Sequence, residues 1–272
     1  MSAAPSQGTR TRSERQVTRP KRPMEAPSPG NPSGPGSDPS GYGRLATRLR
    51  VRTPAYLSGA VLMLGATCAA LLVFLAMVRI IGDPDVVPAM DLRVQRTVES
   101  ILTPTTIHLM VIITSLGGVV LMTLFSLTLA VALWSRRRWV HLFELLVAVP
   151  LGAAAMLAMK QFFQRTRPVE ALLDVRGLSF PSGHAFISMV FFGFVIHLLF
   201  RSRLNPAWIA GGTSLALALI ALIGTSRVYL GVHFLTDVVG GYAAGFLWLV
   251  LALRLVRYVE RRRAARGRPA VP

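Results

Sequence analysis

Six apolar segments, each near the length that crosses a lipid bilayer, divide the chain from residue 55 onward. A helix needs about 20 apolar residues to span the hydrocarbon core, where only helices and closed barrels satisfy their backbone groups. With 52% hydrophobic residues and a mean hydropathy of +0.51, the chain is too apolar for an ordinary soluble domain. We therefore predict an all-α fold, a bundle of six transmembrane helices over approximately 55–81, 107–134, 140–163, 185–200, 207–225 and 238–257.

The two ends of the chain differ from this apolar core. Residues 1 to about 43 are rich in Pro, Ser, Gly and Arg, a composition that cannot bury enough surface to offset its chain entropy. We expect a disordered basic cytoplasmic tail over 1–54, in which Thr53 and Pro54 prepare the start of the first helix. The six-helix domain follows over 55–258, and a basic cytoplasmic tail covers 259–272. The late start of the first apolar segment argues against a cleaved secretory signal.

The formal net charge of the chain is +18, and such a balance can indicate nucleic-acid binding when the basic residues share a folded polar face. Here many arginines lie in the N-terminal tail and in short stretches at 136–138, 201–203 and 261–263, whereas the connection 82–106 is net acidic. If all six segments cross, these stretches fall on one side and the acidic connection on the other, as the positive-inside rule requires. We predict no nucleic-acid partner and a multi-pass protein of the plasma membrane with both termini cytoplasmic.

The connection 82–106 carries apolar residues at helical spacing, among them Val94, Val98 and Ile101. They predict a short helix that either lies on the outer leaflet or packs over the mouth of the bundle, and both alternatives stay open. Cys68 is the single cysteine, so neither an intrachain disulfide nor a cysteine metal site is expected.

Three polar clusters interrupt the apolar pattern, and the count of six crossings places all of them on the outer side. They are Lys160 to Pro168, Pro181 to His184, and Ser226 to Asp237. A charged side chain at the centre of a bilayer costs roughly 2.5–3.5 kcal/mol on insertion scales, so ionisable residues near such segments are functional candidates. The clusters predict one site assembled from three segments.

The first cluster supplies two cations. Lys160 ends a helical segment, and Arg167 precedes Pro168, where the chain is biased away from the helix. Arginine suits bidentate contacts to phosphate and lysine acts as a compact charge, so the two can grip a phosphate from different directions. Taken alone, they would be read as interfacial anchors.

The second cluster resembles a helix start. Ser182 is placed to cap the fourth helix, and Gly183 lets the backbone approach a ligand closely. A helix N-terminus binds anions, and His184 would stand beside the anion in the first turn. Taken alone, the four residues would be an ordinary capped turn.

The third cluster pairs a histidine with a carboxylate. His233 and Asp237 are spaced i, i+4 and would share a face if the sixth helix begins there. A carboxylate bonded to one ring nitrogen fixes the tautomer and leaves the other nitrogen as a nucleophile. Arg227 supplies a third cation. Taken alone, the pair would be a surface contact on a helix.

Together the clusters resemble the type 2 phosphatidic acid phosphatase superfamily of membrane lipid phosphatases. Its motifs read Lys-x6-Arg-Pro, Pro-Ser-Gly-His and Ser-Arg-x5-His-x3-Asp, and this chain has the required residue at every specified position. The resemblance covers residues from about 55 to 258. The resemblance implies that His233 attacks phosphorus to form a phosphohistidine, that Asp237 orients it, and that His184 protonates the leaving oxygen. It also implies a set of phosphate-binding residues: Lys160, Arg167, Ser182, Gly183 and Arg227.

We therefore expect a membrane phosphatase that acts at the outer face on a lipid phosphate or diphosphate. The family's natural substrates are polyprenyl diphosphate, phosphatidylglycerophosphate and phosphatidic acid. Three cations can take over the part of a divalent metal, so we expect neither a metal nor another cofactor. The expected partners are the lipid substrate and membrane lipids, and no obligate protein partner is indicated. The alternatives are a transporter with a phosphate-binding vestibule, for which repeats and a midplane charge are typical, and a non-catalytic scaffold.

Overall fold

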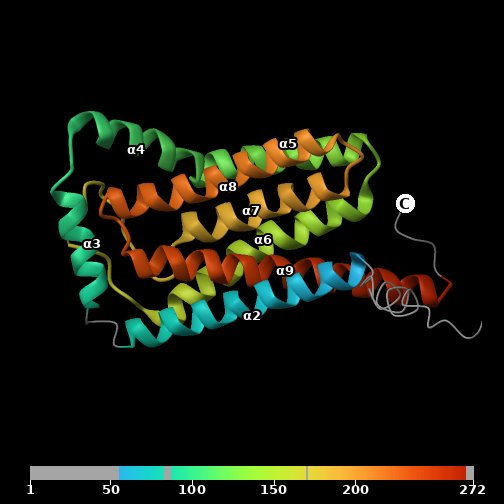
Figure 1. Ribbon diagram of the computed structural model, residues 1–272, viewed down its shortest axis with the longest axis horizontal. Coiled ribbons are helices and arrows are strands. Elements are labelled where there is room, and N and C mark those ends of the chain that lie inside the picture. Colours follow the sequence, from blue (N-terminus) through green and yellow to red (C-terminus); the bar gives the residue numbers. More distant parts are fainter. Residues whose placement is uncertain (1–54, 83–86, 170, 268–272) are drawn as a thin grey trace, which may run out of the picture. The chain divides into compact units, whose positions relative to one another are not determined.

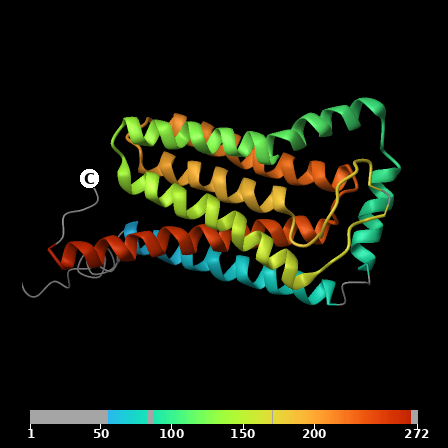
Figure 2. The same ribbon diagram turned by 180° about the vertical axis from the view of Figure 1, so that it is seen from behind.

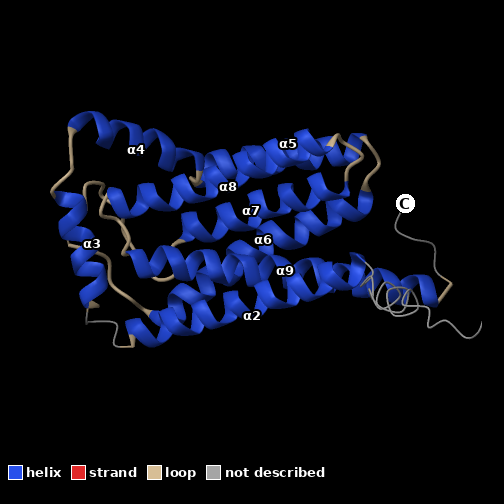
Figure 3. Ribbon diagram, viewed as in Figure 1, coloured by secondary structure: helices blue, strands red, loops and turns tan. Residues whose placement is uncertain are grey.

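The computed structural model describes residues 55–82, 87–169 and 171–267. The expected tail over 1–54, with Thr53 and Pro54, lies outside the described residues. Within them every regular element is a helix, which confirms the all-α prediction (Figures 1 and 3). The helices are α2 Ala55–Ile81, α3 Ala89–Glu99, α4 Pro104–Leu116, α5 Val119–Ser135, α6 Trp139–Phe163, α7 Gly183–Arg201, α8 Pro206–Tyr229 and α9 Leu235–Ala265.

Five helices of the described part, α2, α6, α7, α8 and α9, are long and apolar enough to cross a membrane by themselves. Helices α4 and α5 pass the same test as a pair, bent by 41° at the break between them. Counted as one span, the pair gives the six predicted crossings, and the chain is a multi-pass membrane protein. The expected single span over 107–134 is thus broken, because Gly117 ends α4 and Gly118 starts α5 in an extended conformation.

Helix α7 packs against α6, α8 and α9, so it lies inside the bundle (Figures 1 and 2). Its side chains Phe186, Val190 and Phe194 are fully buried. Two glycines of α9 make the contact close, because a Cβ on Gly241 would lie 2.7 Å from the carbonyl oxygen of Ser182. A Cβ on Gly245 would lie equally near the carbonyl oxygen of Phe186, at 2.7 Å. Small residues at this spacing let helix backbones approach, which places the second polar cluster directly against α9.

Helix α3 packs against α8 and α9 at one end of the bundle (Figure 1). Its Asp91 is buried, with 1% of its surface exposed. The hydroxyl of Tyr229, at the end of α8, donates to the carbonyl oxygen of Ile101 at 3.0 Å. Of the two alternatives for the connection 82–106, the helix packed over the bundle mouth is therefore the one observed.

Two helix ends determine where the polar segments lie. Helix α6 ends at Phe163, and the C-cap residue Gln164 has a φ of 50°, the left-handed conformation common at helix C-termini. This turn directs residues 165–169 and 171–182 across the end of the bundle. At the other end of the chain, α9 continues to Ala265, beyond the expected start of the C-terminal tail at 259. The domain boundaries themselves stay a prediction.

Candidate active site

The three polar clusters meet at the α3 end of the bundle, around a cavity of about 520 Å³. Five of their side chains line it: Lys160, Arg167, His184, Arg227 and His233. None of its lining residues in the described part of the chain is acidic. The cavity therefore offers three cations and two imidazoles, a donor set that suits an oxyanion rather than a divalent metal ion.

Backbone carbonyls hold the first two cations. The Lys160 ammonium donates to the carbonyl oxygens of Leu178 at 2.6 Å and Ser179 at 3.2 Å. The Arg167 guanidinium donates to the carbonyl oxygens of Gly177 at 3.0 Å and Val232 at 2.7 Å. Burial lowers the pKa of Arg167, and the nearby Asp237 opposes this shift. The guanidinium is charged at neutral pH because arginine is not deprotonated in proteins. Neutral carbonyls fix both cations without cancelling their charge, which remains available to an anion.

Three buried side-chain polar atoms of the described residues have no hydrogen-bond partner, and two of them belong to the polar clusters, whereas the third is Oγ1 of Thr213 in α8. The two in the clusters are Nε of Arg227 and Oγ of Ser182. Arg227 is itself positioned by Thr114 of α4, whose Oγ1 accepts from Nη1 at 2.8 Å. A buried polar group left without a partner costs about 1–3 kcal/mol, so the free Nε of Arg227, which lines the cavity, indicates a ligand there. Ser182 is fully buried and is not among the lining residues.

Ser182 occupies the N-cap position of α7, as expected, but its side chain makes no capping hydrogen bond. The expectation of a serine cap is wrong in this respect. The next two residues fulfil their expected places: Gly183 starts the helix, and His184 lies in its first turn. The described residues offer no hydrogen bond to the His184 side chain, so its ring nitrogens are not committed within the protein.

His233 lies ahead of α9 rather than on it, because the helix begins at Leu235 with Phe234 as its N-cap. His233 and Asp237 therefore do not share a helix face, contrary to the expectation, although their side chains are paired. Nδ1 of His233 lies 3.5 Å from Oδ2 of Asp237, and Nε2 lies 3.2 Å from Nη1 of Arg167. A guanidinium can only donate, so Nε2 is the unprotonated nitrogen and Nδ1–H points toward the carboxylate.

The pKa of His233 is lowered to about 4, since burial outweighs the opposing effect of Asp237. The imidazole is therefore neutral at physiological pH, and its Nε2 lone pair faces the guanidinium of Arg167. A neutral, oriented imidazole beside an oxyanion site has the properties of a nucleophile.

A buried network behind His233 contains residues that the sequence did not single out. The Arg165 guanidinium donates to Oδ1 of Asp237 at 2.7 Å and to Oδ2 of Asp91 at 2.9 Å. Asp91 comes from α3, so the partners of Arg165 are distant in sequence and no local pattern connects them. The sequence offered one signal, which is Arg165 itself, a cation between Lys160 and Arg167 to which the family motif assigns no role.

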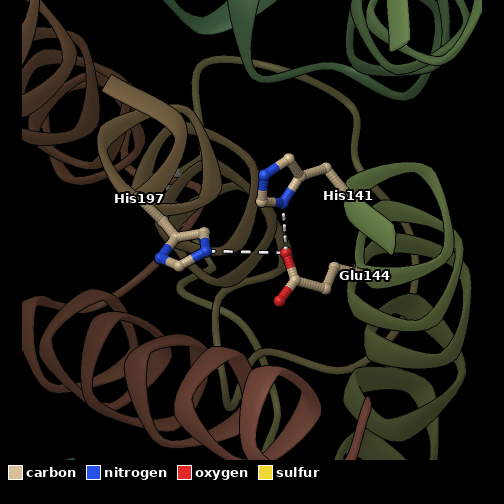
Figure 4. Close-up of side chains that lie close together, drawn as sticks. All are labelled: His141, Glu144 and His197. Atoms are coloured by element: carbon tan, nitrogen blue, oxygen red, sulfur yellow. Dashed lines mark hydrogen bonds and ion pairs between the residues drawn. The ribbon is translucent and has the colours of Figure 1, made fainter. Parts of the chain in front are cut away.

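A second cluster of ionisable residues lies apart from this cavity, where His141 and Glu144 of α6 face His197 of α7 (Figure 4). Glu144 is buried, and its Oε2 accepts from Nδ1 of His141 at 2.8 Å. The guanidinium of Arg257 lies 3.5 Å from Oε1 of Glu144 and 3.1 Å from Nε2 of His197. The carboxylate of Glu144 is therefore paired with His141, His197 and Arg257. A cation of the protein thus already balances the carboxylate.

The fold and the donor set define an integral-membrane protein with an oxyanion site at one end of its helices. The model of the PAP2 superfamily matches residues 141–261 of this chain. This match confirms the family resemblance drawn from the three polar clusters.

Similar proteins include two bacterial phosphatases. Phosphatidylglycerophosphatase B of Bacillus subtilis is 35% identical over 135 residues, which make up 46% of this chain and 63% of that protein. Lipid A 4′-phosphatase of Porphyromonas gingivalis is 30% identical over 126 residues, or 42% of this chain and 49% of that protein. The matched region therefore spans less than two thirds of the length of either relative.

Two solved structures share the fold. The crystal structure of a transmembrane PAP2-type phosphatidylglycerolphosphate phosphatase from Bacillus subtilis gives a TM-score of 0.64 at 27% identity, covering 72% of this chain and 98% of that one. The crystal structure of Aquifex aeolicus LpxE gives a TM-score of 0.50 at 24% identity, covering 61% and 96%, which is a likeness of fold alone.

Proposed function

We propose that this protein is a metal-independent membrane phosphatase that hydrolyses a lipid phosphate or diphosphate through a phosphohistidine at His233. The observation that carries the proposal is the place of Nε2 of His233, which lies unprotonated at the edge of a cavity containing three cations. Phosphoryl transfer needs mainly positioning and charge stabilisation, and this arrangement supplies both.

In the first step, the lone pair on Nε2 of His233 attacks phosphorus and forms an N–P bond. The P–O bond to the leaving oxygen breaks, and its electron pair stays on that oxygen, which belongs to the lipid in a monophosphate and to the lipid-linked phosphate in a diphosphate. The negative charge of the bound phosphate favours protonated His184, which gives the leaving oxygen a proton. Lys160, Arg167 and Arg227 stabilise the charge on the remaining phosphoryl oxygens, with Ser182 and the backbone N–H of Gly183 as further donors. Water then attacks phosphorus while His184 takes its proton, and the N–P bond breaks with its electron pair returning to Nε2, which releases inorganic phosphate and restores neutral His233.

The shape of the cavity favours a lipid as the bearer of the phosphate. Beyond its polar end, the cavity continues between α5 and α6 as an apolar groove that reaches Leu145. From Lys160 to Leu145 the α6 helix rises by roughly 22 Å, enough to lie beside one long hydrocarbon chain. Leu127 and Leu146 line the groove while 57% and 51% exposed, so it opens sideways toward the surrounding lipid.

The substrate candidates are phosphatidylglycerophosphate, phosphatidic acid and a polyprenyl diphosphate. The similarity to a phosphatidylglycerophosphatase and to a lipid A 4′-phosphatase supports a lipid phosphate. The arginine distribution supports an orientation with this end of the bundle at the outer face and both termini in the cytoplasm. In this orientation the enzyme would act on lipids of the outer leaflet.

The test uses purified protein and a panel of the three lipids, with phosphate release and acid-quenched phosphoenzyme as readouts. We expect release from at least one lipid and a phosphohistidine that disappears in His233→Ala. His108→Ala is the matched control, because His108 is an exposed histidine of α4 outside the cavity. Binding of these lipids without phosphate release or phosphoenzyme would instead support the transporter or scaffold alternatives.

A further inference from the structure

Behind the nucleophile, a buried guanidinium holds the carboxylate that faces it. We propose that Arg165 and Asp91 are positioning residues for the His233–Asp237 pair, and that α3 is therefore part of the catalytic apparatus. The proposal rests on the proposed function, since it takes His233 as the nucleophile.

Arg165 is almost fully enclosed, with 1% of its surface exposed. Its Nη1 donates to Oγ1 of Thr236 and to Oδ1 of Asp237, both at 2.7 Å, and the guanidinium also lies 4.4 Å from the ring centre of Phe234. A charge taken out of water needs partners of this kind, because removal of one partner leaves the other charge buried and uncompensated. The guanidinium is thus fixed between the two carboxylates of Asp91 and Asp237.

The Asp237 carboxylate is held at both of its oxygens. Oδ1 accepts from Arg165, while Oδ2 accepts from the hydroxyl of Ser179 and from the backbone N–H of Phe234 at 2.9 Å. Rotation of the carboxylate would break these bonds together. Oδ2 consequently stays on the side of Nδ1 of His233, which keeps the proton on Nδ1 and the lone pair on Nε2.

Asp91 connects this arrangement to α3. Its Oδ1 accepts from the backbone N–H of Thr236 at 3.0 Å, and its Oδ2 accepts from Oγ1 of Thr236 at 2.6 Å and from Arg165. A side chain of α3 thereby satisfies a free N–H in the first turn of α9, next to Asp237. The start of α9 and the guanidinium of Arg165 are thus fixed by the same carboxylate.

Neither Arg165 nor Asp91 lines the 520 Å³ cavity, so neither is expected to touch the phosphate. Loosening them should misplace the nucleophile without removing a binding group. A misplacement of about 1 Å can cost about 100-fold in rate, so the loss should fall on kcat and leave KM nearly unchanged.

The experiment compares Arg165→Lys and Asp91→Asn with Arg176→Ala, a change to an exposed arginine of the same loop. Each full-length variant is given an aryl phosphate, and the burst amplitude counts active sites while the burst rate reports attack by His233. We expect both variants to lose about 10- to 100-fold in rate per active site, with KM within about threefold, and Arg176→Ala to match the parent. Added guanidinium ion should partly restore the rate of Arg165→Ala.

A merely structural role would lower the number of active sites and leave the rate per site unchanged, and that result would overturn the proposal. If Arg165→Lys does not fold, the burst rate per active site of Asp91→Asn tests the proposal instead. Asparagine preserves the shape of the side chain and can still accept from the N–H of Thr236. A parent protein that forms no phosphoenzyme at all would refute the proposed function rather than this inference.

Discussion

Gly117, at the break between α4 and α5, lies against the ring of His184 in the first turn of α7. A Cβ placed on Gly117 would come within 3.1 Å of Cδ2 of His184 and within 2.4 Å of Cγ2 of Ile223. The glycine has a φ of −92°, which any residue adopts, so its role is to leave space rather than to allow an unusual backbone. The break in the span therefore sets the position of a cavity histidine.

We predict that Gly117→Ala lowers turnover of a lipid phosphate, because the added methyl displaces His184 or Ile223. Gly211→Ala is the matched control, since nothing lies within 4 Å of a Cβ at that position of α8. Phosphate release per folded protein is the measurement. Equal activity of the two variants would show that the contact with His184 has no catalytic consequence.

Alanine substitutions of His233 and His184 should have different effects on phosphoenzyme formation. His233→Ala should form no phosphoenzyme with any substrate, because the attacking nitrogen is gone. His184→Ala should still form it with an activated aryl phosphate, whose oxygen leaves without a proton, and should fail with a lipid alcohol as leaving group. Label trapped on His233→Ala but absent from His184→Ala in quenched reactions would reverse the two roles.

The low pKa of His233 predicts an unusually acidic limit for attack on an aryl phosphate. With a pKa lowered by burial to about 4, the imidazole stays neutral as the pH falls from 7 toward 5. The measurement is the burst rate at saturating aryl phosphate, whose leaving group needs no acid. If the bound phosphate leaves the pKa of His233 unchanged, this rate should fall only below about pH 4 to 5. A decline centred near the ordinary histidine pKa of about 6.5 would contradict this environment for His233.

The lowered pKa of His233 also predicts how the stability of the folded protein changes with pH. Below the ordinary pKa of histidine, the unfolded chain binds a proton that buried His233 does not. The contribution of His233 to stability is therefore present above about pH 6.5 and is progressively lost as the pH falls toward about 4. Thermal unfolding in detergent at a series of pH values, with His233→Gln as reference, measures this loss.

Excess chelator should leave the activity unchanged, because the cations at the cavity are Lys160, Arg167 and Arg227. The measurement is lipid phosphate hydrolysis before and after exhaustive treatment with EDTA. A strict dependence on added Mg²⁺ would point to another mechanism.

The orientation can be tested without substrate. In a Cys68→Ala background, a cysteine at the exposed position of Arg176 should react with an impermeant reagent on intact cells. A cysteine at Arg137, in the turn between α5 and α6, should react only after permeabilisation. The reverse pattern would place the cavity in the cytoplasm.

The crossings and the cavity residues were predictable because each depends on local sequence. Apolar length determines the spans, and the helix over 55–81 was predicted with the bounds that α2 has. The break at Gly117 was missed because a glycine pair inside an apolar run does not by itself indicate a bend. The i, i+4 spacing placed His233 near Asp237, but it could not show that the helix starts between them.

The network around Arg165 was not predictable for a different reason. Its bonds join residues 74 apart in the chain, from Asp91 to Arg165, and residues 145 apart, from Asp91 to Thr236. Such contacts arise from packing of α3 on the bundle, and neither residue belongs to a pattern with a regular period. The same holds for Thr114 and Arg227, which meet across α4 and α8.

The sideways opening of the groove between α5 and α6 has a consequence for how the rate depends on substrate. A lipid that enters between these helices arrives by diffusion in the plane of the bilayer, so its relevant concentration is a mole fraction of the leaflet. Diluting vesicles in buffer would then leave the rate per enzyme unchanged, whereas diluting the substrate with an inert lipid would lower it. The membrane would then be the solvent in which the proposed phosphatase meets its substrate.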